Sequence, residues 1–260
     1  MAGFEHALAA ILSGAVVGLS LGLFGGGGSI LATPFLLYIV GVADPHVAIG
    51  TSALAVAVNA CLGLIGHWRL GNVKWSCASM FAFAGILGAA LGSTIGKAVG
   101  GSWLLVLFSL IMVAVGLAML RPRAAGGVAD VRLTVAMAPR VIAIGILVGG
   151  IAGFFGIGGG FLIVPGIMLG TGMTLINAIG SSLVAVALFG LTTAVNYAVS
   201  GLIDWTVAAL FIGGGLIGSL AGAQLAFRLA DRRRMLAHAF AGVIFLVAIY
   251  TFLRSLGAIA

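Results

Sequence analysis

The chain alternates between long apolar runs and short segments that carry charge, proline or glycine. Eight runs approach the length of about 20 apolar residues that a helix needs to cross the hydrocarbon core of a bilayer. They lie at roughly 7–24, 45–66, 75–96, 102–120, 141–156, 175–200, 206–227 and 235–253. This pattern predicts an all-α, polytopic integral membrane protein.

Two further apolar segments, at about 30–42 and 161–172, are shorter, and each follows a glycine cluster. With a rise of about 1.5 Å per residue, such segments extend only about 18–20 Å as helices. We therefore expect two short helices, each preceded by a glycine break in the helical backbone. The sequence leaves open whether they span the membrane or re-enter it.

The two halves of the chain repeat each other. At an offset of 131 residues, Gly14, Gly18, Gly22, Gly25, Gly27, Gly28 and Pro34 match Gly145, Gly149, Gly153, Gly156, Gly158, Gly159 and Pro165. At an offset of 130, AIGTS at 48–52 matches AIGSS at 178–182, and Trp75 matches Trp205. The sequence thus predicts a first membrane repeat over 1–124, a cytoplasmic linker over 125–138 and a second membrane repeat over 139–260.

Basic residues indicate how the two repeats are oriented. Four arginines lie between the halves, within 121–140, and four more lie within 228–234. Cytoplasmic loops are enriched in Lys and Arg, so both segments should face the cytoplasm, with an even number of crossings between them. Counting the short glycine-preceded segment as an element gives four crossings and places ten of the 12 basic residues inside. Two inverted repeats of about five helical elements follow, as in many secondary transporters.

Composition excludes other classes of protein. The chain is 62% hydrophobic and only 7% charged, whereas soluble domains carry about 25% charged residues. Its net charge of +7 reflects a scarcity of acids rather than a nucleic-acid interface. All five acids lie at chain ends or in loops, namely Glu5, Asp44, Asp130, Asp204 and Asp231. Because no acid lies within a span, a cation site or proton relay is not expected there. Enzyme activity, a metal site and a cofactor are not expected either.

Several polar or glycine-rich positions within the spans are candidates for binding an anion. Glycine breaks free backbone N–H groups at the start of the following helix, and those groups favour an anion. Hydroxyls and amides nearby would hydrogen-bond its oxygens. The candidates are Gly26, Gly27, Gly28, Ser29, Thr51, Ser52, Asn59, Gly158, Gly159, Gly160, Ser181, Ser182 and Asn196.

Each of these candidates has a structural alternative. The glycine clusters could serve close helix packing, the hydroxyls could bond to a backbone carbonyl or a neighbouring helix, and the asparagines could join helices. Packing is the preferred interpretation for small-xxx-small faces such as Gly14/Gly18/Gly22 and Gly214/Gly218/Gly222. Lys97 follows Gly92 and Gly96, but this spacing is one residue short of a phosphate loop and lies on a membrane helix, so no phosphate loop is expected there.

The double motif resembles the TauE/SafE sulfite exporter family, also called the toluene-sulfonate uptake permease group. GLFGGGGSILATP at 22–34 with AIGTS recurs as GFFGIGGGFLIVP at 153–165 with AIGSS. The resemblance implies a multi-pass transporter of the bacterial inner membrane for sulfite, sulfonates or related sulfur-containing anions, commonly an exporter. The family is usually described with seven or eight spans, fewer than the ten elements expected here.

We therefore expect a protein that exports a small sulfur-containing anion by alternating access. Its partners would be that anion and membrane lipid, with no nucleic acid and no cofactor, and a homodimer is left open. Two other functions also remain open at this point: a facilitated anion channel and a membrane-embedded assembly subunit that transports nothing.

Overall fold

The computed structural model describes residues 2–120, 127–128, 131, 133–156, 160–228 and 233–257. In these residues the regular structure is helical, apart from one isolated β-bridge between Val128 and Met173. The elements are α1 (Ala2–Phe24), η1 (Gly25–Leu31), α2 (Ala32–Tyr38), α3 (Pro45–Arg69), α4 (Trp75–Ala98), α5 (Gly101–Leu120), α6 (Ala138–Phe155), α7 (Gly160–Thr171), α8 (Leu175–Val199), α9 (Trp205–Arg228) and α10 (Arg233–Ser255). The prediction of an all-helical fold is confirmed.

Within the described part of the chain, six helices are long and apolar enough to cross a membrane: α1, α3, α4, α6, α8 and α9. The described parts of α5, α10 and the two glycine-preceded elements supply shorter apolar stretches, Gly101–Leu117, Ala241–Ser255, Gly28–Tyr38 and Leu162–Thr171. The expected short helices therefore exist. The predicted linker falls between α5 and α6, largely outside the described residues, so the division into two membrane repeats stays a prediction.

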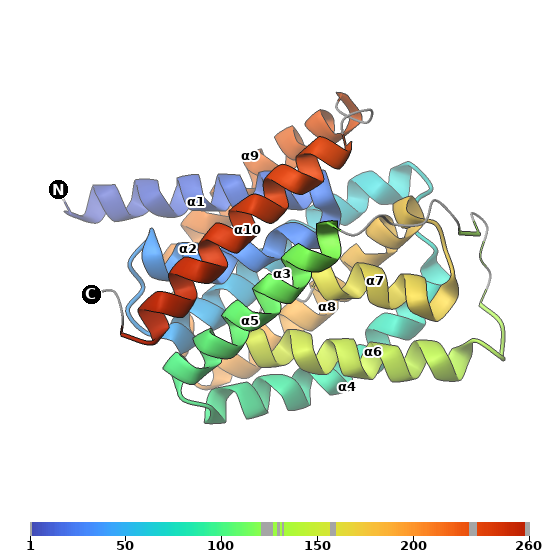
Figure 1. Cartoon of the computed structure of the whole chain (residues 1–260), viewed down its shortest axis with the longest axis horizontal. Coiled ribbons are helices and arrows are strands. Elements are labelled where there is room, and N and C mark those ends of the chain that lie inside the picture. The colour runs from blue at the N-terminus through green and yellow to red at the C-terminus, as the bar shows by residue number, and fades with distance from the viewer. Residues whose placement is uncertain are drawn as a thin grey trace.

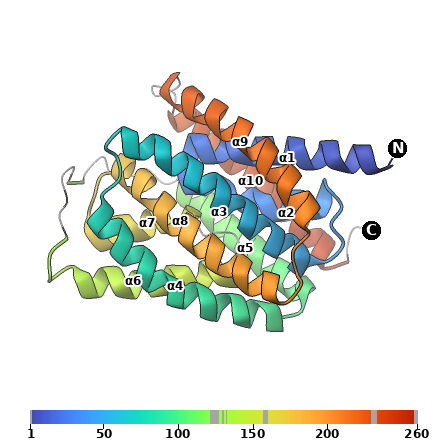
Figure 2. The ribbon, with the colours of Figure 1, turned by 180° about the vertical axis from the view of Figure 1, so that it is seen from behind.

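The helices form pairs around a central pair (Figures 1 and 2). α1 packs along α9 and α4 along α6, while α3 packs against α8, and α5 against α10. Burial identifies the centre of the bundle. In the apolar stretch that could cross a membrane, 72% of α8 and 61% of α3 is buried inside the structure, against 39–44% in the other four long helices. α3 and α8 are thus the helices best placed to carry an internal site.

Glycines allow the outer pairs to approach closely. A Cβ atom on Gly18 of α1 would overlap the backbone of Gly215 in α9, and one on Gly218 would overlap the carbonyl oxygen of Ala15. The α4–α6 contact is built in the same way, since a Cβ on Gly88 would overlap the Ile146 carbonyl oxygen. Helices in lipid associate through such close packing rather than through the hydrophobic effect. The packing interpretation of these glycine faces is therefore confirmed.

Large apolar side chains cover the outside of the bundle. On α4, for example, Phe83, Leu87 and Leu91 recur every four residues and are 64–66% exposed. A soluble protein rarely leaves apolar patches of that extent open to water. These faces are suited to lipid, as the composition predicts.

The two ends of the bundle differ in charge. α3 ends at Arg69, α4 begins next to Lys74 and α6 contains Arg140 in its first turn; these helix ends lie towards the right of Figure 1. We call this the basic end. α1 begins and α10 ends at the opposite side, which we call the far end, and Figure 2 places the α8–α9 turn there too. The inverted orientation of the repeats in a membrane stays a prediction.

Candidate functional site

The two glycine-preceded elements meet inside the bundle. η1, which contains Gly26, Gly27, Gly28 and Ser29, contacts α7 directly. Ser29 is fully buried, and a Cβ on Gly28 would overlap the backbone of α1 at Leu21. Gly158 and Gly159 lie outside the described residues, and Gly160 begins α7. The first glycine cluster therefore combines close packing with a position next to the second break.

The Gly50–Thr51 pair of α3 holds the turn between α8 and α9. A Cβ on Gly50 would overlap the carbonyl oxygen of Leu202. The Thr51 hydroxyl accepts a hydrogen bond of 3.0 Å from the backbone N–H of Asp204. Because Asp204 also accepts a bond from the N–H of Val207 at the start of α9, the pair fixes the place where α9 begins.

Gly180 and Ser181 of α8 hold the turn between α3 and α4 in the same way. A Cβ on Gly180 would lie against the carbonyl oxygen of Asn72, and the Ser181 hydroxyl accepts a bond of 2.9 Å from the N–H of Lys74. All four positions match those of the first pair at the offset of 130. We call Gly50–Thr51 and Gly180–Ser181 the turn-holding pairs. The Thr51 and Ser181 hydroxyls therefore have the structural role considered above, in which a hydroxyl bonds to a neighbouring segment of the chain.

Ser52 and Ser182 are fully buried and bond back to their own helices. The Ser52 hydroxyl donates to the Ile49 carbonyl at 2.9 Å, and the Ser182 hydroxyl donates to the Ile179 carbonyl at 2.8 Å. Only the first half adds a second hydroxyl: Thr33 of α2 lies 2.9 Å from the Ser52 oxygen. Val164 occupies the matching position in α7. The Thr33–Ser52 pair is therefore a buried polar point at which α2 meets α3.

Asn59 is a predicted site residue whose side chain has no hydrogen-bond partner among the described residues. It is 1% exposed, and both its amide nitrogen and its amide oxygen are unpaired. The side chain fills the space opposite Gly215 of α9, as Phe189 fills the space opposite Gly85 at the matching position. Leaving a buried polar group unpaired costs about 1–3 kcal/mol. Such a group in a span is a candidate for contact with a ligand.

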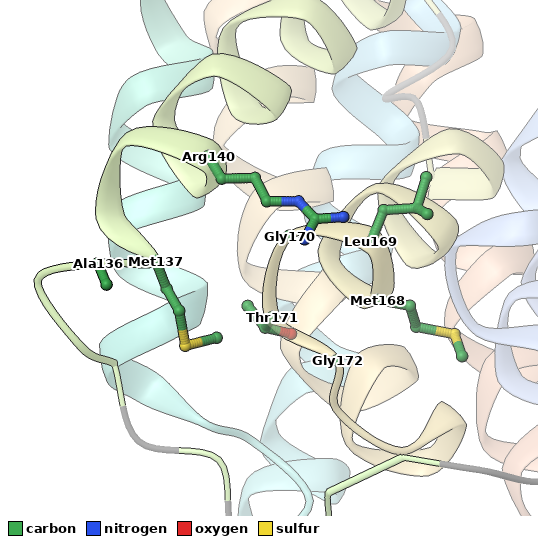
Figure 3. A pocket seen from close by; sticks show the side chains of 8 residues that line it. All are labelled: Ala136, Met137, Arg140, Met168, Leu169, Gly170, Thr171 and Gly172. Atoms are coloured by element: carbon green, nitrogen blue, oxygen red, sulfur yellow. The ribbon is translucent and has the colours of Figure 1, made fainter.

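Cavities open at both ends of the bundle. At the basic end, a cavity of about 440 Å³ lies between the start of α6 and the end of α7. Figure 3 shows the Arg140 side chain extending across it towards α7. The lining residues are Ala136, Met137, Arg140, Met168, Leu169, Gly170, Thr171 and Gly172. A guanidinium is thus the charged group of this cavity.

The far end has a cavity of opposite charge, about 360 Å³ in volume. Its lining includes His6 of α1 and the carboxylates of Asp44 and Asp204, which precede α3 and α9. Ile30 of η1 and Ile163 of α7 have no exposed surface. The two cavities share no lining residue, so they are separate pockets, one at each end of the bundle.

Comparison with known proteins decides the family. Residues 10–251 match the family model described as "Sulfite exporter TauE/SafE". The chain belongs to the TauE/SafE family. No solved structure matches it significantly.

Several relatives of this TauE/SafE protein share most of its length. A Xylella fastidiosa (strain 9a5c) protein named "Probable membrane transporter protein" is 52% identical over 252 residues, which is 96% of this chain and 97% of the relative. A Haemophilus influenzae protein of the same name is 30% identical over 76% of each chain. The Bacillus subtilis protein "Probable membrane transporter protein YunE" is 27% identical over 83% of this chain and 86% of its own. The chain is thus a multi-pass membrane transporter with bacterial relatives.

The remaining predicted residue, Asn196, lies in a polar network that the sequence reasoning missed in part. In this TauE/SafE protein, the Lys97 ammonium of α4 donates to the Asn196 carbonyl at 3.0 Å, to its side-chain oxygen at 2.7 Å and to the Ser200 hydroxyl at 2.8 Å. Lys97 had a recognisable signal: it stands where the second half has Phe227, and it is one of the two basic residues that the predicted topology leaves outside.

Proposed function

We propose that this TauE/SafE transporter exports sulfite, a sulfonate or a related sulfur-containing anion by alternating access. The observation that carries the proposal is the combination of Asn59 of α3, whose amide is buried and unpaired, with the buried hydroxyl pair that Ser52 of the same helix forms with Thr33 of α2. Amide and hydroxyl groups donate to oxyanions. Among the described residues the carboxylates are those of Glu5, Asp44 and Asp204, all at the far end, where they do not repel an anion in the interior.

Charge supports export as the direction of transport. Arg140 at the basic-end cavity attracts an anion from the side predicted to be cytoplasmic. An inside-negative membrane potential contributes about 2.3 kcal/mol per charge per 100 mV, so it drives a monovalent anion outward without a coupled ion. The fully buried side chains of η1, α3, α7 and α8 favour a carrier over an open channel, since passage of an anion would require these packed elements to move apart.

Flux measurements on reconstituted protein test this function. Proteoliposomes loaded with radiolabelled sulfite or methanesulfonate should release the anion, and an excess of unlabelled anion outside should accelerate release through exchange. Release at rates near diffusion, without exchange, would instead indicate a channel. No movement of any sulfur-containing anion by correctly inserted protein would refute the proposal.

Variants of the buried hydroxyls locate the site. Thr33→Val and Ser52→Ala remove donors with little change in volume, so each should raise the KM for the anion. Ser79→Ala is the matched control, because the Ser79 hydroxyl also bonds back to its own helix, at 2.7 Å to Trp75, but on the exposed surface. Equal flux in all three variants would remove the Thr33–Ser52 pair from the site.

A further inference from the structure

The contact between α4 and α8 at the far end contains a polar network built around one positive charge. Lys97 has three N–H groups, and all three are donated to uncharged oxygens, two on Asn196 and one on Ser200. The face of the Tyr197 ring lies 5.8 Å from the ammonium and adds a cation–π contact. The charge is therefore held in place without a carboxylate in this set of partners.

The rest of the network points in one direction. The Asn196 amide nitrogen donates to the hydroxyls of Ser93, at 2.6 Å, and Thr94, at 2.9 Å. Both hydroxyls in turn donate to the Ala90 carbonyl. A chain of hydrogen bonds that all run the same way polarises its members. This one starts at an ammonium and ends at a neutral carbonyl, so none of its acceptors carries a negative charge.

The network occurs at only one of the two matching helix contacts. At the offset of 130, Lys97 corresponds to Phe227, Asn196 to Gly66 and Ser200 to Leu70. The matching α9–α3 contact is formed without those polar residues. Other structural features of this fold, including the turn-holding pairs, occur in both halves. A feature needed on one side of the membrane only would be present in one half and absent from the other, as this network is.

We propose that the Lys97 ammonium is an anion-binding site at the far end, where a sulfur oxyanion replaces the neutral oxygens of Asn196 and Ser200 as acceptor of its N–H groups. Charge-assisted hydrogen bonds are about twice as strong as neutral ones, so an oxyanion competes well for the same N–H groups. The site is reachable because Ser200 and Thr94 are exposed and Lys97 is only half-buried. The proposal rests on the proposed function and assigns its far-side binding step.

Occupation of this site also acts on the contact between the helices. When the anion takes the N–H groups of Lys97, Asn196 and Ser200 lose the bonds that they accept from Lys97, while the bonds that Asn196 donates to Ser93 and Thr94 of α4 remain. The link between α4 and α8 is then weakened at the far end, where an exported anion must leave. Arrival of the anion and opening of that end are thereby coupled.

Side-specific kinetics in oriented proteoliposomes test the site, with methanesulfonate as the probe. Lys97→Gln removes the charge and should raise the far-side KM on the order of 10-fold or more, the equivalent of a lost charged hydrogen bond. The basic-side KM should stay unchanged, and Lys97→Arg should restore the far-side value. Ser200→Ala removes one competing acceptor and should lower the far-side KM. Arg254→Gln is the matched control, since Arg254 is at the same end but bonds to Tyr250 of α10.

The outcomes separate this site from a structural link and from the proposed function. If Lys97→Gln and Ser200→Ala both change kcat on both sides without a shift in far-side KM, Lys97 only joins two helices and the site is refuted. An equal shift in Arg254→Gln would refute it too, by indicating general surface charge. If wild-type protein transports no sulfur-containing anion, the proposed function fails. The site is then judged by methanesulfonate-induced thermal stabilisation, which must be present in wild type and lost in Lys97→Gln.

Discussion

Replacing Thr51 with valine separates a structural role of this hydroxyl from a role in binding substrate. Valine keeps the branched shape of threonine, so the packing of this fully buried side chain is preserved. What disappears is the oxygen that accepts the 3.0 Å bond from the Asp204 N–H. That N–H is then left without its partner at the start of α9.

The expected loss of stability can be worked out from this one bond. An unpaired buried donor costs about 1–3 kcal/mol. Asp204 is only half-buried, so the lower end, about 1 kcal/mol, applies here. For a chain of this size that corresponds to a fall in Tm of about 2–4 °C. Ser181→Ala removes the matching bond of 2.9 Å to Lys74 and should lower Tm by a similar amount.

Thermal unfolding in detergent, followed by tryptophan fluorescence, measures this loss, and flux in proteoliposomes is measured on the same samples. We expect Thr51→Val to lower Tm and to keep most of the transport activity. A variant with wild-type Tm and no transport would refute the reasoning, because the hydroxyl would then act on the anion rather than on the turn.

Three further predictions concern packing, topology and the interior. Gly218→Ala should lower the free energy of unfolding by about 1–3 kcal/mol, because the added methyl group would overlap the α1 backbone. Gly213→Ala is the control: a Cβ there meets no atom within 4 Å, so helix propensity should raise the free energy of unfolding by up to about 1 kcal/mol. Equal Tm values for the two variants would contradict the packing described. In a background without the native cysteines, an impermeant maleimide should label Leu70→Cys only from the cytoplasm and Val199→Cys only from outside, and the reverse result would invert the topology. Asn59→Leu should raise Tm by replacing an unpaired amide, and the proposed function requires it to impair flux; wild-type flux would exclude Asn59 from the site.

Local features of this fold could be predicted from the sequence because their causes are local. Runs without charge define the spans, and the glycine clusters before 30–42 and 161–172 mark the short helices. The close-packing face of α1 also follows from the spacing of Gly14 and Gly18, since that spacing places them on one helix face. None of these inferences needs to know which helix is the neighbour.

The roles of single polar residues depend on that neighbour and could not be predicted. Thr51 and Ser52 are adjacent and similar in the sequence, yet one hydroxyl bonds to a turn 153 residues away and the other to its own helix and Thr33. Asn59 and Asn196 look equally like isolated polar residues, but one is unpaired and the other lies at the centre of a network. Lys97 could have been found by asking where the two halves differ rather than where they agree.

The turn-holding pairs affect the order in which the protein is completed during synthesis. The Lys74 N–H cannot donate to Ser181 until that serine has been synthesised, 107 residues later. The Thr51 hydroxyl cannot accept its bond from Asp204 until 153 further residues have been added. At about 5–20 residues per second, the first of these delays lasts roughly 5–20 s. During that time the turn between α3 and α4 lacks its bond to Ser181, and the Thr51 hydroxyl lacks its bond from Asp204. A nascent chain that stops near its middle therefore lacks the contacts that hold these positions in the complete transporter.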